Sequence, residues 1–202
     1  MRKSKAETAR TRNRIVETAS DALRRNGISG TSLHELMSEA GMTHGGFYRH
    51  FDSKEQLIAE ACSRGCDALL DTIRAAGSRS PDACPAGTSP GLAAIADTFL
   101  TPEYRDEDAA CCPFVSFGSE LARADAATRH AATEGMRRAI GLLEQEFHDG
   151  DMARMRAIAV FAALIGGGTL ARIVDDPAFS DEILQAAKML ICRISRDATE
   201  GG

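Results

Sequence analysis

The stretch Thr43-His44-Gly45-Gly46-Phe47-Tyr48-Arg49-His50-Phe51-Asp52-Ser53-Lys54 combines basic, aromatic and hydrogen-bonding side chains with a single acid, Asp52. Its two adjacent glycines are poor helix formers, each costing about 1 kcal/mol relative to alanine inside a helix. A helix that keeps them presents a bare backbone, which can lie against the wall of a DNA groove. We therefore interpret this stretch as a short helix that faces nucleic acid.

The flanking residues predict where the neighbouring helices begin and end. Ser32 and Glu35 have the spacing of a capping box, which indicates a helix that starts at Ser32 and stops at Gly41. Thr43 is expected to cap the next helix, and Ser53 repeats the capping-box spacing before a longer helix. Two short helices joined by a tight turn are typical of a helix-turn-helix, whose second helix enters the major groove.

The rest of the chain is also helical by its apolar spacing, and no strand periodicity appears. A first helix is expected over residues 8–25, and residues 77–91 hold three prolines and three glycines, which marks a linker. Further helical patterns cover 92–100, 114–124, 126–147, 152–174 and 181–195. We predict an all-α chain with a helix-turn-helix DNA-binding domain at residues 1–55 and a helical regulatory, ligand-binding and dimerisation domain at residues 56–202.

Charge is distributed unevenly along the sequence. The whole chain carries a net charge of −5, yet residues 1–55 hold ten Lys/Arg against seven Asp/Glu. Six of those basic residues, Arg12 among them, fall within the first fourteen positions, as in an arm and first helical turn that face phosphates. For the first five residues a solvated terminus is an equally good interpretation.

The sequence gives no sign of a membrane segment, a cofactor or an active site. The longest uncharged stretch, residues 157–171, is shorter than the roughly 20 residues that a span needs. We expect a cytoplasmic protein without membrane contact, whose six cysteines are reduced. Cys62 and Cys66 lack further ligands at a familiar spacing, so we predict no metal site. Neither a phosphate-cradling glycine loop nor a nucleophile elbow is present, and we predict no cofactor and no enzyme.

Residues 41–57 resemble the recognition segment of the TetR family of transcriptional regulators. The glycines, Tyr48, the His50-Phe51 pair and the Ser53-Lys54 pair match that pattern together. The resemblance covers about residues 10–60 and is weaker beyond them. It implies a repressor that binds a palindromic double-stranded DNA operator as a homodimer and is released by a small-molecule effector, whose class the sequence leaves open.

The residues assigned to DNA are those expected to point away from the core of this domain. Tyr48, His50 and Lys54 are expected to hold phosphates, and His44 and Arg49 are candidates for base edges. The resemblance adds His34 and Gly46 as positions that approach bases, although a glycine offers only its backbone, which favours Thr43 and Arg49 instead. Packing of the domain by Tyr48 and His50 is the alternative. The full predicted set is Ser32, His34, Thr43, His44, Gly45, Gly46, Tyr48, Arg49, His50 and Lys54.

Two apolar stripes mark the last two helices. The first comprises Met155, Ile158, Ala162, Ile165, Thr169 and Ile173, and the second comprises Ile183, Leu184, Ala187, Leu190, Ile191 and Ile194. Such stripes can be buried within one subunit or against a symmetric copy, and the residues leave both open. The TetR resemblance favours a homodimer through the last two helices.

The middle helices offer candidates for the regulatory trigger. Six large side chains suit an effector pocket, although each also suits a core: Phe99, Tyr104, Phe114, Phe117, Met136 and Phe161. Cys111 and Cys112 precede the helix at Phe114, and a thiolate is stabilised near a helix N-terminus. An electrophile or redox switch through Cys112 or Cys111 is therefore a second hypothesis, against the interpretation of both as apolar fillers. A third is a helical enzyme or protein-interaction module without specific DNA binding.

Overall fold

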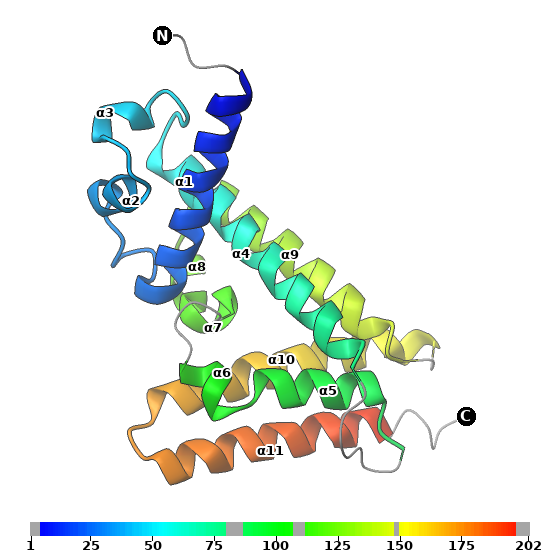
Figure 1. The fold of residues 1–202 in the computed structure, drawn as a ribbon. Helices are drawn as coiled ribbons and strands as arrows, with labels where there is room; N and C mark the ends of the chain where they lie inside the picture. The colour runs from blue at the N-terminus through cyan, green and yellow to red at the C-terminus, as the bar shows by residue number, and fades with distance from the viewer. Residues whose placement is uncertain (1–4, 80–86, 107–111, 148–149, 197–202) are drawn as a thin grey trace. The chain divides into compact units, whose positions relative to one another are not determined.

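The computed structural model describes residues 5–79, 87–106, 112–147 and 150–196, and within these ranges it contains helices and no strand (Figure 1). The predicted all-α class is confirmed. The helices are α1 (Lys5–Asn26), α2 (Leu33–Glu39), α3 (His44–Phe47), α4 (Lys54–Gly77), α5 (Pro90–Phe99), α6 (Pro102–Asp106), α7 (Pro113–Ser116), α8 (Gly118–Leu121), α9 (Ala126–Glu144), the 3-10 helix η1 (Gly150–Met152), α10 (Ala153–Ile173) and α11 (Pro177–Arg196).

The helices form two compact units. Unit 1 comprises Met1–Asp67 and Cys112–Gly135, and unit 2 comprises Ala68–Cys111 and Met136–Gly202. Helices α4 and α9 each continue from one unit into the other along the sequence. Unit 1 thus adds the first half of α4 and the remote segment α7–α8 to the helix-turn-helix, while the predicted domain division at residue 55 stays a prediction.

The core of unit 1 holds the short helix α3 in place. Ile15 and Leu23 of α1, Leu36 of α2 and Phe47 of α3 are all buried, as is Phe51. The rings of Phe47 and Phe51 stack with centroids 5.4 Å apart, so both aromatic residues face the core as the sequence predicts. A four-residue helix is unstable by itself in water, and burial of two aromatic rings supplies the stabilisation that it lacks.

The start of α2 has the predicted capping box. The Ser32 hydroxyl accepts a hydrogen bond from the Glu35 amide at 3.2 Å, and the Glu35 carboxylate accepts one from the Ser32 amide at 3.2 Å. The Ser32 hydroxyl also donates to that carboxylate at 2.7 Å, and this bond lowers the pKa of Glu35 from its ordinary value. Gly41 then takes a φ of +66°, which ends the helix region in a conformation that suits glycine.

The starts of α3 and α4 differ in detail from the prediction. Thr43 occupies the N-cap position of α3, but its side chain makes no capping hydrogen bond. At α4 the Ser53 hydroxyl accepts from the Gln56 amide at 3.1 Å, as expected. The Gln56 side chain, however, accepts from the amide of Asp52 at 2.8 Å, one residue before the expected donor. The reciprocal bond of this box therefore reaches back into the chain that follows α3.

The single helix predicted over residues 114–124 is wrong, because Phe117 divides it into α7 and α8. Phe117 has φ −135° and ψ 25°, outside the helical region, and its side chain is buried. Its amide donates to the Pro113 carbonyl at 3.1 Å, and its carbonyl accepts from Leu121 at 3.1 Å. Phe117 thus ends one helix and begins the next. Helix α6, a five-residue turn, is too short to show periodicity in the sequence.

In unit 2, α10 and α11 lie side by side and α5 packs along them (Figure 1). Gly167 makes this close approach possible, because a Cβ there would lie 2.6 Å from the Ala187 Cβ. Among the described residues α10 is the helix long and apolar enough to cross a membrane by length and composition alone. A core helix passes the same test, and Val160 and Leu164 of α10 are buried in unit 2.

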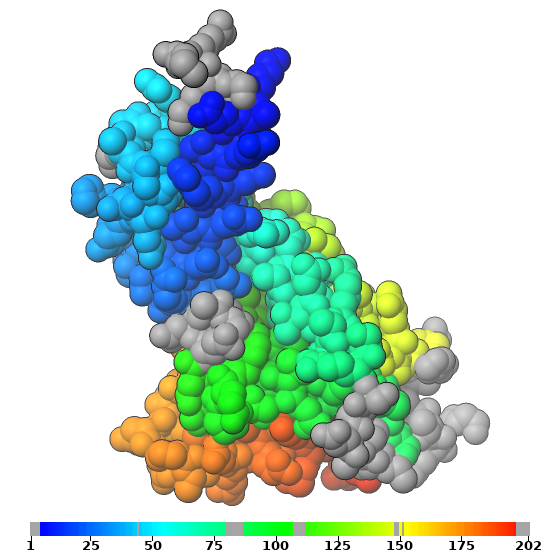
Figure 2. Space-filling model, viewed as in Figure 1, coloured from blue at the N-terminus to red at the C-terminus, as the bar shows by residue number. Residues whose placement is uncertain are grey.

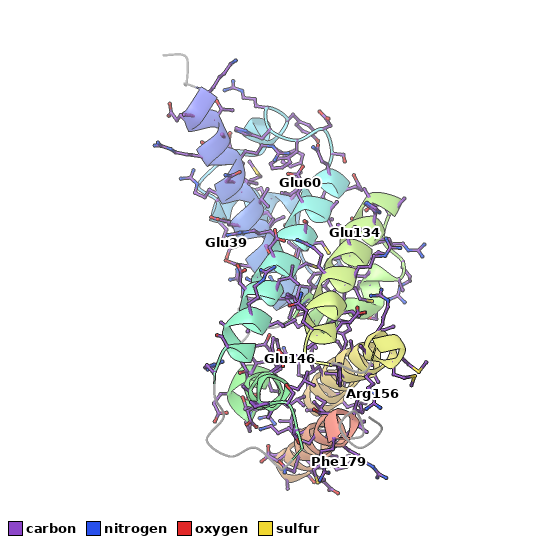
Figure 3. The ribbon with its side chains drawn as sticks, turned by 90° about the vertical axis from the view of Figure 1, so that its right-hand side faces the viewer. Glu39, Glu60, Glu134, Glu146, Arg156 and Phe179 are labelled. Atoms are coloured by element: carbon purple, nitrogen blue, oxygen red, sulfur yellow. The ribbon has the colours of Figure 1, made fainter. Side chains whose placement is uncertain are left out.

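The apolar stripe predicted on α10 lies on the surface of the single chain. Met155, Ile158 and Ile173 are exposed, the last at 71%, while the buried face of α10 consists of other residues. The stripe predicted on α11 is divided, since Leu184 is buried and Leu190 is 49% exposed. Phe179, near the start of α11, is exposed as well (Figure 3). A single copy of the chain thus leaves a broad apolar surface on its last two helices uncovered.

Candidate nucleic-acid interface

The end of α3 presents polar side chains to solvent. Tyr48 caps α3, and its side chain is 65% exposed while its ring packs edge-on against Phe47 at 5.1 Å. Arg49, Thr43 and Gly45 are exposed too. The space-filling view shows α2 and α3, in light blue, as a continuous outer surface beside α1 (Figure 2). The guanidinium of Arg49 and the phenol of Tyr48 are therefore next to each other in the sequence at this surface, and both are groups that bind phosphates or base edges.

Three further predicted residues differ in how much of them reaches that surface. His34, on α2, is exposed, and Gly46 is half-buried. His44 begins α3, and its side chain lies outside the described part of the structure. Ser32 uses its hydroxyl in the capping box, which fixes the orientation of that hydroxyl. Its assignment to DNA stays a prediction.

Lys54 lies at the junction between the loop before α2 and the start of α4. Its Nζ donates to the backbone carbonyl of Thr31 at 2.8 Å, and the Thr31 hydroxyl in turn donates to the Gly27 carbonyl at 2.7 Å. An ammonium group has three donors, so this bond leaves two for a phosphate. The assignment of Lys54 to the DNA backbone stays a prediction.

Arg12, which the sequence groups with the basic residues expected to face phosphates, makes contacts within unit 1. Its guanidinium forms an ion pair with Glu60 of α4, with Nη1 and Oε2 2.5 Å apart, and its Nε donates to the carbonyl of His50. These partners lie 48 and 38 positions away. No local spacing in the sequence indicates such a pair, so the sequence predicts neither this ion pair nor a role for Glu60.

The six candidates for an effector pocket fall into both units. Phe114 and Phe117 are buried in unit 1, while Phe99, Tyr104, Met136 and Phe161 belong to unit 2. Phe99 and Tyr104 meet edge-on at 4.8 Å. Three surface grooves of about 330, 370 and 510 Å³ in the described residues are lined by other side chains. The assignment of these six residues to a pocket stays a prediction.

The cysteines of the described residues are mostly buried. Cys112 is the N-cap of α7 and only 2% exposed, and Cys111 lies outside the described residues. Cys62 and Cys66 are fully buried on α4, and a hydrogen bond with the Cys66 thiol lowers the pKa of Cys62. Within the described ranges, no three His, Cys, Asp or Glu side chains are grouped so that they could hold a metal ion.

Comparison with known proteins places the helix-turn-helix in a family. Residues 15–61 match the family described as bacterial regulatory proteins, tetR family. The chain is 37% identical over 59 residues to a probable acrEF/envCD operon repressor of Escherichia coli K12, and 34% identical over 73 residues to the regulator TtgR of Pseudomonas putida. These alignments cover 29% and 36% of this chain but only 27% and 31% of the relatives, so they span less than a third of the curated relatives' length.

Solved structures extend the likeness of fold to nearly the whole chain. The reduced form of NemR from Escherichia coli superposes with a TM-score of 0.75 at 21% identity, covering 91% of this chain and 96% of that one. A TetR transcriptional regulator from Chloroflexus aurantiacus gives 0.73 at 20% identity, with coverage of 92% and 96%. At these identities the likeness establishes the fold alone. The N-terminal helices of this chain thus match the family of bacterial regulatory proteins described as tetR, and nearly the whole chain has the fold of the solved structures named above.

Proposed function

We propose that the protein is a cytoplasmic repressor that binds a palindromic DNA operator as a homodimer and is released by a small molecule. The observation that carries the proposal is the exposure of Tyr48 and Arg49 directly beside the buried Phe47. The buried ring holds the backbone of α3 in one orientation, and the exposed side chains are then available to DNA. The name of the E. coli relative, an operon repressor, agrees with this assignment.

Two kinds of contact are expected at the DNA. Tyr48, His50 and Lys54 fix the position of the domain on the phosphates, which carries no sequence information. Arg49, together with Thr43 and the predicted contacts of α2, reads base edges in the major groove. Ser32 at the N-cap of α2, His34 of α2, and His44, Gly45 and Gly46 of α3 complete this proposed surface.

The uncovered apolar surface of α10 and α11 supports the homodimer. Exposed Met155, Ile158, Ile173 and Leu190 are large apolar groups whose contact with water is unfavourable. A symmetric partner presents the same face, so one patch covers the other. Two reading heads then meet half-sites one helical turn, about 34–36 Å, apart or a multiple of it.

Release requires an effector that prefers one separation of the heads over another. A ligand with equal affinity for both arrangements shifts nothing, however tightly it binds. We propose a small molecule of unknown class as the trigger, with modification of Cys112 or Cys111 as the alternative. The 2% exposure of Cys112 favours the small molecule, because a buried thiol is shielded from reagents.

Fluorescence anisotropy with duplexes selected from a random library tests the DNA-binding function. Wild-type protein is expected to enrich a palindrome and to bind it with a steep salt dependence. Lys54→Ala should weaken binding to every duplex and reduce the salt slope by about one unit for each head. Arg49→Ala should instead relax sequence preference. Salt-independent or absent binding to duplex DNA would point to a protein-interaction module.

A further inference from the structure

Arg12 connects three segments of unit 1 that are remote in sequence. Its Nε donates to the His50 carbonyl at 3.2 Å, and its Nη2 donates to the Glu60 carboxylate at 2.6 Å. Its Cζ lies 4.6 Å from the centroid of the Phe51 ring, within range of a cation–π contact. The guanidinium is planar and rigid, so these contacts fix α1, the chain after α3, and α4 relative to one another.

A second connection runs from α4 to the same short stretch of chain. The Gln56 side chain donates to Glu60 Oε1 at 3.1 Å and accepts from the Asp52 amide at 2.8 Å. Glu60, labelled on α4 in Figure 3, therefore holds both the guanidinium and the glutamine amide. The Glu60 carboxylate therefore accepts from two side chains that each hold the chain after α3: Arg12 donates to the carbonyl of residue 50, and Gln56 accepts from the amide of residue 52.

The tied residues directly follow the exposed ones that are proposed to reach DNA. Tyr48 is the C-cap of α3, Arg49 follows it, and the His50 carbonyl that accepts from Arg12 comes next. A helix of four residues has too few internal hydrogen bonds to fix its own orientation. The orientation of such a helix depends on supporting contacts from neighbouring segments. A displacement of its side chains by about 0.5 Å already weakens recognition of a partner.

We propose that Arg12 and Glu60 are positioning residues for operator recognition, which orient residues 43–49 from behind without touching DNA. The inference rests on the proposed DNA binding by α3. Both side chains are about one third exposed, and ion pairs near the surface contribute little to stability. The pair therefore acts mainly on the orientation of the reading segment and little on the folding of the domain.

The charge of Glu60 allows this role to be separated from simple electrostatics. Loss of a carboxylate near DNA reduces repulsion from the phosphates, so electrostatics alone predicts tighter binding by Glu60→Ala. Loss of a positioning group predicts weaker binding to the operator. The two effects have opposite signs, which makes Glu60 more informative than the cation Arg12.

A second ion pair between α1 and α4 supplies the matched control. Arg64 Nη2 and Glu17 Oε1 lie 3.2 Å apart, and both side chains are about half exposed. Neither side chain makes a hydrogen bond or an ion pair with residues 43–52 in the described part of the chain. Glu17→Ala removes one negative charge and one bridge between the same two helices, as Glu60→Ala does, but it leaves the chain after α3 untouched.

Anisotropy titrations of the full-length variants with the selected operator and with a scrambled duplex, at several salt concentrations, test the proposal. Glu60→Ala is expected to lose operator affinity by about tenfold, within the range for impaired reading of one base pair. Its affinity for the scrambled duplex should equal or exceed that of the wild type, because the lost negative charge acts on every duplex alike. Arg12→Lys, which keeps the charge, should show the same loss, and Glu17→Ala should bind the operator at least as tightly as the wild type.

Circular dichroism at the assay temperature shows which variants are folded. If Glu60→Ala is not folded, Arg12→Lys is used in its place to test the proposal. Operator binding by a folded Glu60→Ala or Arg12→Lys protein that equals or exceeds the wild type overturns the proposal, as does an equal loss in Glu17→Ala. A wild type that binds no duplex selectively refutes the proposed function instead, and that result is visible before any variant is made.

Discussion

The carboxylate of Glu120 on α8 accepts hydrogen bonds from Ser29, which lies in the loop between α1 and α2. The Ser29 amide donates to Glu120 Oε2 at 2.8 Å, and the Ser29 hydroxyl lies 3.3 Å from the same oxygen. The carboxylate sits so close to Gly27 that a Cβ there would lie 2.6 Å from Oε1. The acceptor for this loop amide is provided by a residue 91 positions later in the sequence. The segment α7–α8 is therefore a structural part of the helix-turn-helix unit.

Glu120→Ala should destabilise unit 1 by about 1 kcal/mol. The variant leaves the Ser29 amide without its charged acceptor, although water can partly replace a bond at an exposed site. Urea unfolding of the full chain, followed by circular dichroism, measures the difference. Ser119→Ala, at the exposed neighbouring position, should leave the midpoint unchanged. Equal midpoints for Glu120→Ala and the wild type would show that the loop does not depend on α8.

Gly135→Ala should destabilise the protein by about 2 kcal/mol or more. A Cβ at this buried position of α9 would lie 2.6 Å from the Cβ of Cys66 on α4, which cannot move without shifting its helix. Gly141, on the same helix, has no such neighbour within 4 Å. Gly141→Ala should therefore stabilise by about 0.5–1 kcal/mol through better helix propensity. Thermal unfolding of both variants should give midpoints on opposite sides of the wild type.

The sequence predicted the helix-turn-helix in most of its detail, because the signals there are local. The capping box at Ser32, the left-handed Gly41 and the buried Phe47 and Phe51 each depend on residues within a few positions of one another. The positions of the longer helices were likewise predicted to within a few residues from apolar spacing.

What the sequence did not predict depends on contacts between distant segments. The division of α7 from α8 follows from the burial of Phe117, which periodicity does not reveal. The Arg12–Glu60 pair joins residues 48 positions apart, and a count of basic residues placed Arg12 with the phosphate-facing arm. The proposed DNA contacts and effector pocket also need a bound partner, and they stay predictions.

The contribution of the Ser32–Glu35 capping box should depend on pH. The folded state lowers the pKa of Glu35 through its bond with the Ser32 hydroxyl, so the carboxylate form is favoured in the folded protein. That stability is present above the ordinary glutamate pKa and is lost as pH falls through the lowered value. Urea unfolding should show Ser32→Ala less stable than wild type near neutral pH, by about 1 kcal/mol for a lost cap. The difference in unfolding free energy between wild type and Ser32→Ala should become smaller in acid. A difference that stays constant with pH would show that the charged form of Glu35 does not contribute to the cap.

The cysteines should differ in their reactivity with iodoacetamide. Cys192 is partly exposed, while Cys62, Cys66 and Cys112 are buried. Alkylation needs an accessible thiolate, so peptide mapping by mass spectrometry should find Cys192 labelled before the three buried cysteines, which should be labelled only on unfolding. Labelling of Cys112 in the native protein as fast as Cys192, together with loss of operator affinity, would favour the thiol-based trigger over the small molecule.

Leu190→Glu should convert the protein to a monomer that remains folded. Leu190 is 49% exposed in the single chain, so the substitution leaves the core of unit 2 intact but places a charge on the proposed dimer surface. A charge buried against a symmetric apolar partner carries a large desolvation cost, and the same residue meets the interface from both subunits.

Sedimentation equilibrium and operator titration measure the outcome together. A monomer presents one head, so it loses the gain in affinity that comes from tethering two heads to adjacent half-sites. Gln185→Glu is the matched control, because it adds the same charge to an exposed position that lines the groove between α5 and α11. It should stay dimeric with wild-type affinity. If Leu190→Glu also stays dimeric, the two copies associate through a different surface, and the apolar face of α10 and α11 needs another explanation.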